Sequence, residues 1–500
     1  MRPTRRSFLM GAGSAGLLGA YGGSAVASLK GGPLALSAER RVIEVRGRAA
    51  TVAGLRQPNG MHGLRLRAGD RFRVALTNRL AEPTLIHWHG LRPPLHQDGM
   101  PGVSQPLLEP GAAYEYDFVL RDAGTYWMHA HHGLQEQGLL AAPLIIAEGE
   151  PVDEQEVVLM LHDFSFRPPE EILASLRSRA AEVTSALMAA QSGGAHSAHG
   201  AASQGASGHG ASAHGSSAHG QPEAAHEHAM HGGPHLNDVE LDAYLANDRT
   251  LADPELVQVE RNGRVRLRII NGASSTNFHI DLGALEGDLV AVDGRSVQPI
   301  RGRRFGLAMS QRIDLRIDIH EPGAFPILAV REGDRQVTGI VLHTPGAVVP
   351  RVAEAVHEPA PAISFAEEER LRALEPLPDR PTDRRMTIAL TGDMTAYGWG
   401  LDGSGAAQMR DYQVRAGERV EITLENRTNM SHPMHLHGHR FQVVGAEGRR
   451  FPGAVRDTVL VPHRSSVTIA LDADNPGAWM LHCHNLYHMA AGMMAMLRYV

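Results

Sequence analysis

Two stretches of this chain carry the same ordered pair of histidine motifs, and this repeat restricts the folds open to the chain. In both, the asparagine of an Asn-Arg pair stands nine residues before a His-x-His-Gly motif, at residues 87–90 in the first stretch and 435–438 in the second. A second block follows each motif, with His-Ala-His at 129–131 and His-Cys-His at 482–484. Internal repeats of this kind indicate homologous structural units. We therefore expect two related domains, each with two His-x-His pairs.

Polar and apolar residues alternate in many short runs, for example at 71–76, 265–270 and 419–424. Alternation with a period of two is typical of β-strands. The run at 265–270 begins a third copy of the repeat, which lacks the histidine pairs. At 500 residues the chain also exceeds what one hydrophobic core normally serves. The sequence thus predicts an all-β protein with three β-sandwich domains.

The predicted domains follow one another along the chain, with one linker and one insert. The domains cover residues 40–148, 150–346 and 380–500, and a linker rich in Pro and Glu covers 347–379. An insert at 191–235 in the middle domain repeats Ala, Ser, Gly and His and has too few apolar residues to form a core. We expect this insert to be a disordered loop, preceded by an amphipathic helix at 169–190.

Residues 1–27 have the features of an export signal. Arg5 and Arg6 form a twin-arginine motif, and a stretch rich in Gly and Ala leads to a small-residue cleavage site at Ala27. We expect export by the twin-arginine route to the periplasm. That stretch is short and glycine-rich for an anchor, and no other apolar run is long enough to span a bilayer, so we do not expect an integral membrane protein. A net charge of −7 argues against nucleic acid as a partner.

Cys483 is the only cysteine of the chain and lies between His482 and His484. Because it has no partner for a disulfide within the chain, it is an inert packing residue, a thiol nucleophile or a metal ligand. A catalytic thiol needs one histidine as its base, so the surrounding histidine cluster favours a metal. A thiolate with two imidazoles and a distant methionine is the ligand set of a blue-copper electron-transfer site. The candidate ligands are Cys483, His432 and His488, with Met493 as the long axial ligand.

Side chains two residues apart point to the same side of a β-strand. His482 and His484 therefore face one way and Cys483 the other, so the thiolate can bind one copper while its neighbours reach a separate cluster. A single His-x-His pair is often no more than part of a solvated strand. Four pairs at matching places supply eight imidazoles, enough to hold three coppers between the first and third domains. The eight are His87, His89, His129, His131, His435, His437, His482 and His484.

These motifs closely resemble those of the multicopper oxidases, the family of laccases, ascorbate oxidase and bacterial cuprous oxidases. The motifs at 87–90, 127–131, 432–438 and 482–493 match the four family motifs in order and spacing. The resemblance covers residues 40–500 apart from the insert, and it implies three cupredoxin-like Greek-key β-sandwiches with four copper ions per chain. It implies that His87 and His435 bind the single normal copper. The coupled copper pair would be held by His89, His129, His131, His437, His482 and His484.

The resemblance also implies a mechanism. A reducing substrate gives one electron at a time to the blue copper, the bridge at Cys483 carries each electron to the cluster, and dioxygen takes four to become water. Asp98 matches the acidic residue that the family places beside the cluster, which predicts a proton relay. Taken alone, Asp98 in Asp-Gly is equally well explained as a turn residue. Asp457 is predicted to orient a ligand histidine.

The export signal, the axial methionine and the histidine-rich insert look most like the bacterial copper-resistance branch of the family. We therefore predict Cu(I) as the reductant and a role in copper tolerance, with phenols and other small aromatics as the alternative. The well-known cuprous oxidases have methionine-rich inserts, so this insert could instead capture or buffer copper. Met394 and Met489 are candidates for Cu(I) entry.

Three rival functions are weighed against this prediction. A copper nitrite reductase needs two domains and no coupled copper pair, and a redox-inactive relative would have lost ligands, whereas none is missing here. A copper store based on the insert could coexist with catalysis.

One chain holds a complete site, so we expect a monomer.

Overall fold

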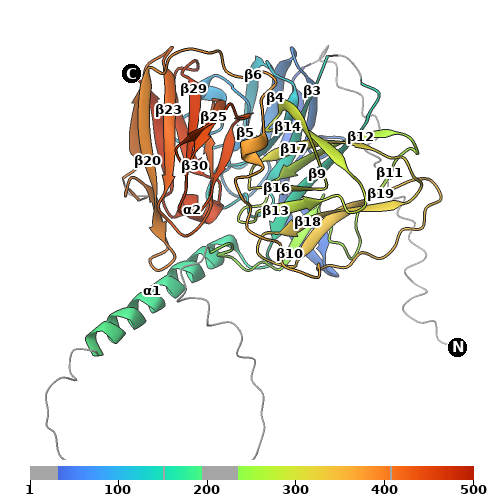
Figure 1. Ribbon diagram of the computed structural model, residues 1–500, viewed down its shortest axis with the longest axis horizontal. Coiled ribbons are helices and arrows are strands. Elements are labelled where there is room, and N and C mark those ends of the chain that lie inside the picture. The colour runs from blue at the N-terminus through green and yellow to red at the C-terminus, as the bar shows by residue number, and fades with distance from the viewer. Residues whose placement is uncertain (1–31, 150–151, 194–234, 406–407) are drawn as a thin grey trace, which may run out of the picture.

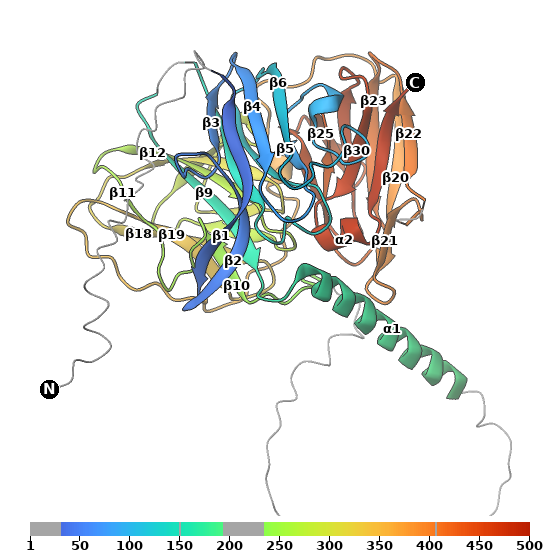
Figure 2. The same ribbon diagram turned by 180° about the vertical axis from the view of Figure 1, so that it is seen from behind.

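The computed structural model describes residues 32–149, 152–193, 235–405 and 408–500. The predicted export signal and nearly all of the predicted insert lie outside these residues. Within them the strands form six sheets, two in each of three successive parts of the chain (Figures 1 and 2). The prediction of an all-β protein with three β-sandwiches is confirmed.

The first sandwich pairs a sheet of order β2-β1-β4-β6 with a sheet of order β3-β8-β7-β5. Its strands are β1 (Leu34–Val45), β2 (Arg48–Arg56), β3 (Leu64–Arg67), β4 (Arg71–Asn78), β5 (Ile86–His89), β6 (Ala113–Val119), β7 (Gly124–Ala130) and β8 (Ala141–Ala147). Burial alternates along β4, where Phe72, Val74 and Leu76 enter the core. This is the period-two pattern of the sequence, now with its apolar side facing the other sheet.

The second sandwich has sheets of order β10-β9-β12-β17-β14-β15 and β11-β19-β18-β13-β16. Its strands are β9 (Gln155–Phe164), β10 (Ala243–Ala246), β11 (Leu256–Gln258), β12 (Arg264–Asn271), β13 (Phe278–Asp281), β14 (Gly287–Val292), β15 (Arg295–Gly302), β16 (Arg304–Leu307), β17 (Arg312–Asp318), β18 (Ala324–Arg331) and β19 (Val337–His343). One hydrophobic core continues from this sandwich into the third.

The third sandwich has a sheet of order β21-β20-β23-β29-β25-β26, with β27 on β25, and a sheet of order β22-β31-β30-β24-β28. Its elements are β20 (Arg384–Asp393), β21 (Gly398–Leu401), β22 (Arg410–Val414), β23 (Arg419–Asn426), β24 (His432–Leu436), β25 (Phe441–Ala446), β26 (Arg449–Arg450), β27 (Val455–Arg456), β28 (Thr458–Val461), β29 (Ser466–Asp472), β30 (Ala478–Cys483), helix α2 (Leu486–Ala490) and β31 (Met494–Tyr499). The three sets of strands follow the predicted domains in order, and the boundary residues themselves stay a prediction.

An asparagine at the same place in each of the three sandwiches makes the same two kinds of hydrogen bond. Asn78, Asn271 and Asn426 each end a strand, at β4, β12 and β23. Each side-chain oxygen accepts a hydrogen bond from the backbone N–H two residues later, at 2.9, 3.0 and 2.9 Å. Each side-chain amide donates to a backbone carbonyl on a neighbouring segment, at 2.8, 3.1 and 3.1 Å. The repeat therefore marks one turn that leads the chain from one sheet to the other.

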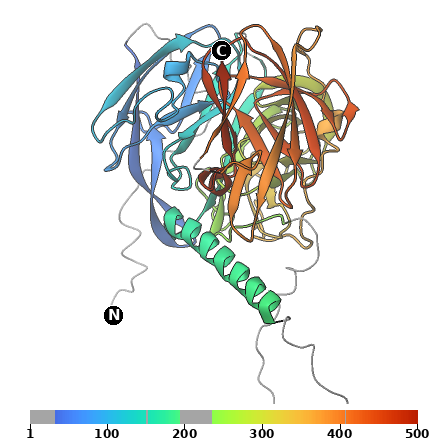
Figure 3. The ribbon, with the colours of Figure 1, turned by 90° about the vertical axis from the view of Figure 1, so that its left-hand side faces the viewer.

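Helix α1 (Pro169–Gly193) begins at the residue where the sequence predicts a helix and projects away from the sandwiches (Figure 3). Its first turns are fixed by buried Ile172 and Leu176, which belong to the core shared by the second and third sandwiches. Arg177 also donates to the backbone oxygen of Ala490, at the end of α2. Among the described residues, no helix combines the length and the apolar character needed to cross a membrane.

His162 on β9 is a buried histidine that lies outside the predicted copper sites. Its side chain is 2% exposed, and neither ring nitrogen has a hydrogen-bond partner within the described part of the chain. Burial lowers its pKa to about 4; the charge of Asp248 opposes this shift, while Arg41 and His62 add to it. Because the imidazole ionises at about 6.5 in the unfolded chain, the unfolded state takes up a proton between these values and the folded state does not.

We expect the substitution His162→Gln to reduce acid destabilisation. Stability that depends on a neutral His162 is complete above pH 6.5 and is lost as the pH falls toward 4. We expect the free energy of unfolding, measured with urea on copper-free protein, to fall between about pH 7.5 and 4.5 in both proteins. The fall should be roughly 2–3 kcal/mol smaller in the variant than in the wild type. His320→Gln, at an exposed position, is the matched control. Equal losses in wild type and His162→Gln would contradict the expectation.

Candidate metal centre

The predicted cluster histidines lie on or just after four strands. Two of these strands pair in one sheet of the first sandwich, and two pair in one sheet of the third. His87 and His129 are opposite each other on β5 and β7, and His435 and His482 are opposite each other on β24 and β30. Directly paired residues of antiparallel strands project to the same face. Each sandwich therefore gathers its own four imidazoles.

The two sets of imidazoles meet between the first and third sandwiches, and all eight rings are buried. The rings of His87 and His437 stack at a centroid distance of 3.8 Å, and those of His89 and His435 stack at the same distance. Each stack joins one sandwich to the other. The sequence predicted that these eight imidazoles converge between the first and third sandwiches, and the structure brings all eight side chains together there.

Nitrogen atoms without hydrogen-bond partners line the space between these rings. Among the described residues, six cluster histidines each have one buried ring nitrogen with no partner: His87 Nε2, His89 Nδ1, His129 Nε2, His131 Nε2, His435 Nε2 and His484 Nε2. Nε2 of His437 and Nε2 of His482 face each other at 3.1 Å. An unpaired buried polar group costs about 1–3 kcal/mol. Imidazole nitrogens are good copper ligands, so this donor set fits copper.

Donor atoms of several triads lie within 4.8 Å of one another. The triads include His87 with His435 and His437, His87 with His89 and His129, and His131 with His437 and His482. His87 thus lies close both to its predicted partner at the single copper and to predicted ligands of the coupled pair. The division of the eight rings among three coppers stays a prediction.

A second constellation lies on the other face of β30. Cys483 Sγ is 3.6 Å from His432 Nδ1 and 3.8 Å from His488 Nδ1, and the two nitrogens are 3.2 Å apart. Met493 is also buried, and its backbone oxygen accepts a hydrogen bond from the backbone N–H of Cys483. One sulfur and two nitrogens at these distances are the donor types that a blue-copper site requires in its equatorial plane.

Residues behind this constellation hold the outer nitrogens of its histidines. His488 Nε2 donates to Asp238 Oδ2 at 3.1 Å, and His432 Nε2 is hydrogen-bonded to Thr428 Oγ1 at 2.7 Å. Both Nδ1 atoms are thereby directed toward the sulfur. Burial raises the pKa of the Cys483 thiol, so a thiolate at this position needs a cation beside it, which a copper ion supplies.

The electrostatics of both constellations favour neutral imidazoles. Burial lowers the pKa of the ligand candidates, and neighbouring imidazoles lower it further. The affected residues are His87, His89, His131, His432, His435, His437, His482 and His484. Neutral imidazole is the form that binds metal, so the site is held in its ligand form.

Asp98 lies beside the cluster as well as in a turn. It follows the short 3-10 helix Leu95–Gln97, and its side chain is buried. Its Oδ2 accepts a hydrogen bond from His437 Nδ1 at 2.8 Å, and its backbone oxygen accepts one from His87 Nδ1 at 2.8 Å. Burial raises the pKa of Asp98 to about 6, against the charges of His87 and His129. Its Oδ1 has no hydrogen-bond partner among the described residues.

Two further carboxylates at the site were not predicted. Glu136 is buried, its Oε2 accepts from His129 Nδ1 at 2.8 Å, and its Oε1 is 3.8 Å from His484 Nδ1. Asp238 holds His488 as described above. The spacing of Glu136 from the histidine motif gave no signal of this contact, and Asp238 is 250 residues from His488. Asp457, predicted to orient a histidine, contacts His89 at 3.1 Å.

Comparison with known proteins agrees with this geometry. Three family models described as multicopper oxidase match residues 45–151, 212–347 and 379–500. The multicopper oxidase MmcO of Mycobacterium tuberculosis is 30% identical over 87% of this chain and 81% of its own length. A copper resistance protein A homolog of Pseudomonas syringae pv. tomato is 26% identical over 99% of both chains.

The fold is also that of solved structures. The crystal structure of a multi-copper oxidase from Pseudomonas thermotolerans matches with a TM-score of 0.65 and 25% identity, over 93% of this chain and 98% of that chain. The family matches fall on all three sandwiches, and the buried histidines and Cys483 gather in two groups. The chain belongs to the multicopper oxidase family and is a copper-dependent oxidoreductase that uses dioxygen.

Proposed function

We propose that this oxidase works with four copper ions, one at the constellation around Cys483 and three in the cluster of eight histidines. The observation that carries this proposal is the direct linkage of the two constellations, because His482 and His484 adjoin Cys483 in the chain. The cluster histidines supply the six unpaired nitrogens described above. Bound copper would supply one-electron redox chemistry at the first constellation and four-electron reduction of dioxygen to water at the second.

We assign the ligands as the sequence motifs indicate. His432, Cys483, His488 and Met493 would hold the blue copper, and His87 and His435 would hold the single normal copper. The coupled pair would be held by His89, His129, His131, His437, His482 and His484. Cys483 provides the covalent route between the two constellations, through the peptide bonds to its neighbours.

Protons for water formation reach the cluster through Asp98. Reduction of one dioxygen to two waters consumes four electrons and four protons. The Asp98 side chain is anchored through Oδ2 to His437, while Oδ1 accepts no hydrogen bond in the described residues and lies 3.5 Å from His87 Nδ1. A proton held at Oδ1 can therefore be given up without breaking the hydrogen bond that orients His437.

Metal analysis and spectroscopy of the copper-loaded protein test the four-copper proposal. We expect four coppers per chain, an intense thiolate band near roughly 600 nm, and uptake of one dioxygen for every four electrons from an aromatic dye. A nitrite reductase or a redox-inactive relative would fail the oxygen-uptake measurement. More than four coppers per chain would indicate additional storage by the insert.

We propose Cu(I) as the physiological reductant and copper tolerance as the biological role. The relative named copper resistance protein A homolog supports this. The first turns of α1, which precedes the insert, and His235, which follows it, also contact residues close in sequence to the proposed blue-copper ligands. Arg177 of α1 donates to the oxygen of Ala490, and the backbone N–H of His235 donates to the oxygen of Asn429 at 2.9 Å. A segment that belongs to the middle sandwich in sequence is thus attached beside the third.

Replacement of residues 194–234 by a Gly/Ser linker of the same length tests this substrate, because it removes the histidines of this segment and leaves α1 and His235 in place. We expect a higher Michaelis constant for Cu(I), with little change for an aromatic dye that needs no copper capture. Met394 and Met489, both half-buried against the core, are secondary candidates for Cu(I) entry. An unchanged Michaelis constant for Cu(I) would exclude the insert from substrate delivery. Preference for phenols in both forms would favour a laccase-type substrate.

We also propose that the protein is exported by the twin-arginine route to the periplasm and acts there as a monomer. The Arg5-Arg6 motif near the start of the chain supports the route. Replacing both arginines by lysine should retain the protein in the cytoplasm, as measured by cell fractionation.

A further inference from the structure

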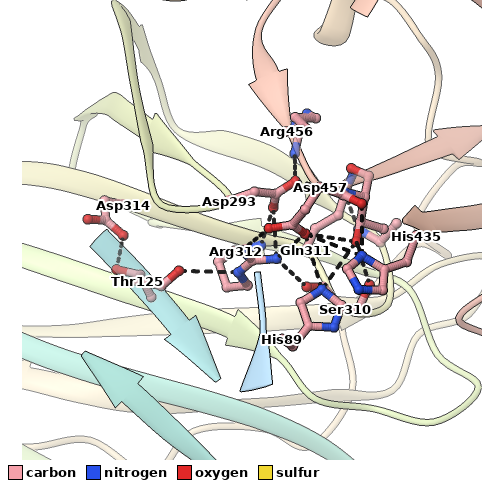
Figure 4. A network of polar contacts seen from close by, with 12 residues as sticks. His89, Thr125, Asp293, Ser310, Gln311, Arg312, Asp314, His435, Arg456 and Asp457 are labelled. Carbon is pink, nitrogen blue, oxygen red and sulfur yellow. Dashed lines mark hydrogen bonds and ion pairs between the residues drawn. The ribbon is translucent and has the colours of Figure 1, made fainter. Parts of the chain in front are cut away.

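The middle sandwich holds none of the proposed copper ligands, yet one of its arginines pairs with a carboxylate that contacts a cluster histidine. Arg312 begins β17, and its side chain is 0% exposed. The guanidinium donates through Nη1 to Asp457 Oδ1 at 2.7 Å and through Nη2 to Asp457 Oδ2 at 2.5 Å. Its Nε donates to the backbone oxygen of Thr125 at 3.2 Å. One buried cation thus joins all three sandwiches (Figure 4).

Asp457 also accepts hydrogen bonds from two cluster histidines. Its Oδ1 accepts a hydrogen bond from His89 Nε2 at 3.1 Å, and its backbone oxygen accepts one from His435 Nδ1 at 2.8 Å. His89 belongs to the first sandwich and His435 to the third, and their rings stack on each other. Figure 4 shows Arg312, Asp457 and the two histidines as one continuous network.

The network determines which nitrogen of each histidine is available to a metal. A carboxylate paired with a guanidinium acts only as an acceptor, so Nε2 of His89 carries the proton and Nδ1 offers its lone pair. The carbonyl of Asp457 fixes the opposite tautomer in His435, with Nε2 available. Those two nitrogens are among the ones without a partner in the described part of the chain.

We propose that Arg312 is a positioning residue for the copper cluster, acting through Asp457 on the orientation and tautomer of His89. The inference rests on the proposed function, since it takes the eight histidines as copper ligands. The middle sandwich then contributes to the cluster by fixing a ligand of the first sandwich against the third. Hydrogen-bond partners of metal-bound histidines commonly have this role.

The matched control is a second buried arginine that links sandwiches without touching a cluster histidine. Arg268, 3% exposed, donates to Thr125 Oγ1 at 3.0 Å and to Asp314 Oδ2 at 2.7 Å. Lysine keeps the charge but cannot reproduce a bidentate guanidinium contact. Arg312→Lys and Arg268→Lys therefore disturb comparable ion pairs, and only the partner of Arg312, Asp457, contacts a proposed ligand.

The test compares copper-loaded full-length wild type, Arg312→Lys, Asp457→Asn and Arg268→Lys under competition with a copper chelator. We expect Arg312→Lys and Asp457→Asn to weaken retention of cluster copper by about 10- to 100-fold, with the thiolate band kept. A variant that combines Arg312→Lys with Asp457→Asn should retain cluster copper as well as the weaker of the two single variants, because both substitutions act through one contact. Paramagnetic resonance should show more detectable copper as the coupled pair is disturbed. Arg268→Lys should match the wild type.

Retention of cluster copper in Arg312→Lys and Asp457→Asn equal to that in Arg268→Lys would overturn the inference. If Arg312→Lys does not fold, as judged by loss of the thiolate band, the nearly isosteric Asp457→Asn decides by the same measurement. Failure of the proposed function is seen separately, because wild type would then lack cluster copper or the thiolate band, and this inference would fall with it.

Discussion

Replacement of Cys483 by serine is expected to remove the thiolate band and to lower turnover by about 1,000-fold or more, which equals roughly 4 kcal/mol of activation free energy. The sulfur lies within 4 Å of both Nδ1 atoms of its proposed partners, His432 and His488. A serine hydroxyl is a poor copper ligand and cannot give the intense Cu–thiolate absorption. The electron route into the cluster is lost with the sulfur.

The cluster should survive this change, because Cys483 faces away from it. We expect copper analysis of Cys483→Ser to fall from four to three per chain, with paramagnetic resonance still reporting the normal copper. The matched control is Met489→Leu, a half-buried residue next to the same constellation, which should keep the band. Persistence of the thiolate band in Cys483→Ser would refute the central ligand assignment.

Replacement of Asp98 by asparagine is expected to slow oxygen reduction by about 100- to 10,000-fold, the usual contribution of a positioned proton donor. The amide keeps the shape of the side chain and can still accept the hydrogen bond from His437 Nδ1. It cannot hold an exchangeable acid proton at the position of Oδ1. Copper content and the thiolate band should therefore stay at wild-type values.

Separate measurement of the two half-reactions provides the control for Asp98→Asn. Anaerobic reduction of the blue copper by an aromatic dye should keep its wild-type rate. Asp98 contacts histidines of the cluster but none of the proposed blue-copper ligands. Reoxidation by dioxygen in a stopped-flow experiment should be slow. A wild-type reoxidation rate would show that Asp98 is only the turn residue that its Asp-Gly sequence also allows.

The sandwiches could be predicted because their signals are local and repeated. Alternating burial along β4 follows directly from the alternating sequence, and the repeated asparagines end equivalent strands in all three parts of the chain. The His-x-His pairs could be predicted to converge because strand geometry directs alternate side chains to one face. These features need no knowledge of how the sandwiches pack together.

The partners behind the ligands could not be predicted in the same way. Asp238 and Arg312 reach His488 and Asp457 across sandwich interfaces, from 250 and 145 residues away in the chain. Their placement depends on the packing of whole sandwiches, which no sequence period encodes. The first turns of α1 and His235 are a similar case, since they contact the third sandwich although they belong to the second in sequence.

The split origin of the cluster has a consequence for the synthesis of the protein. Four imidazoles come from residues 87–131 and four from residues 435–484, and the thiolate lies in the penultimate strand. With the proposed ligands, a product of premature termination after the middle sandwich has half of the cluster imidazoles and lacks Cys483, so it cannot form either proposed copper centre. On this assignment, copper loading of either centre requires the third sandwich to have been synthesised.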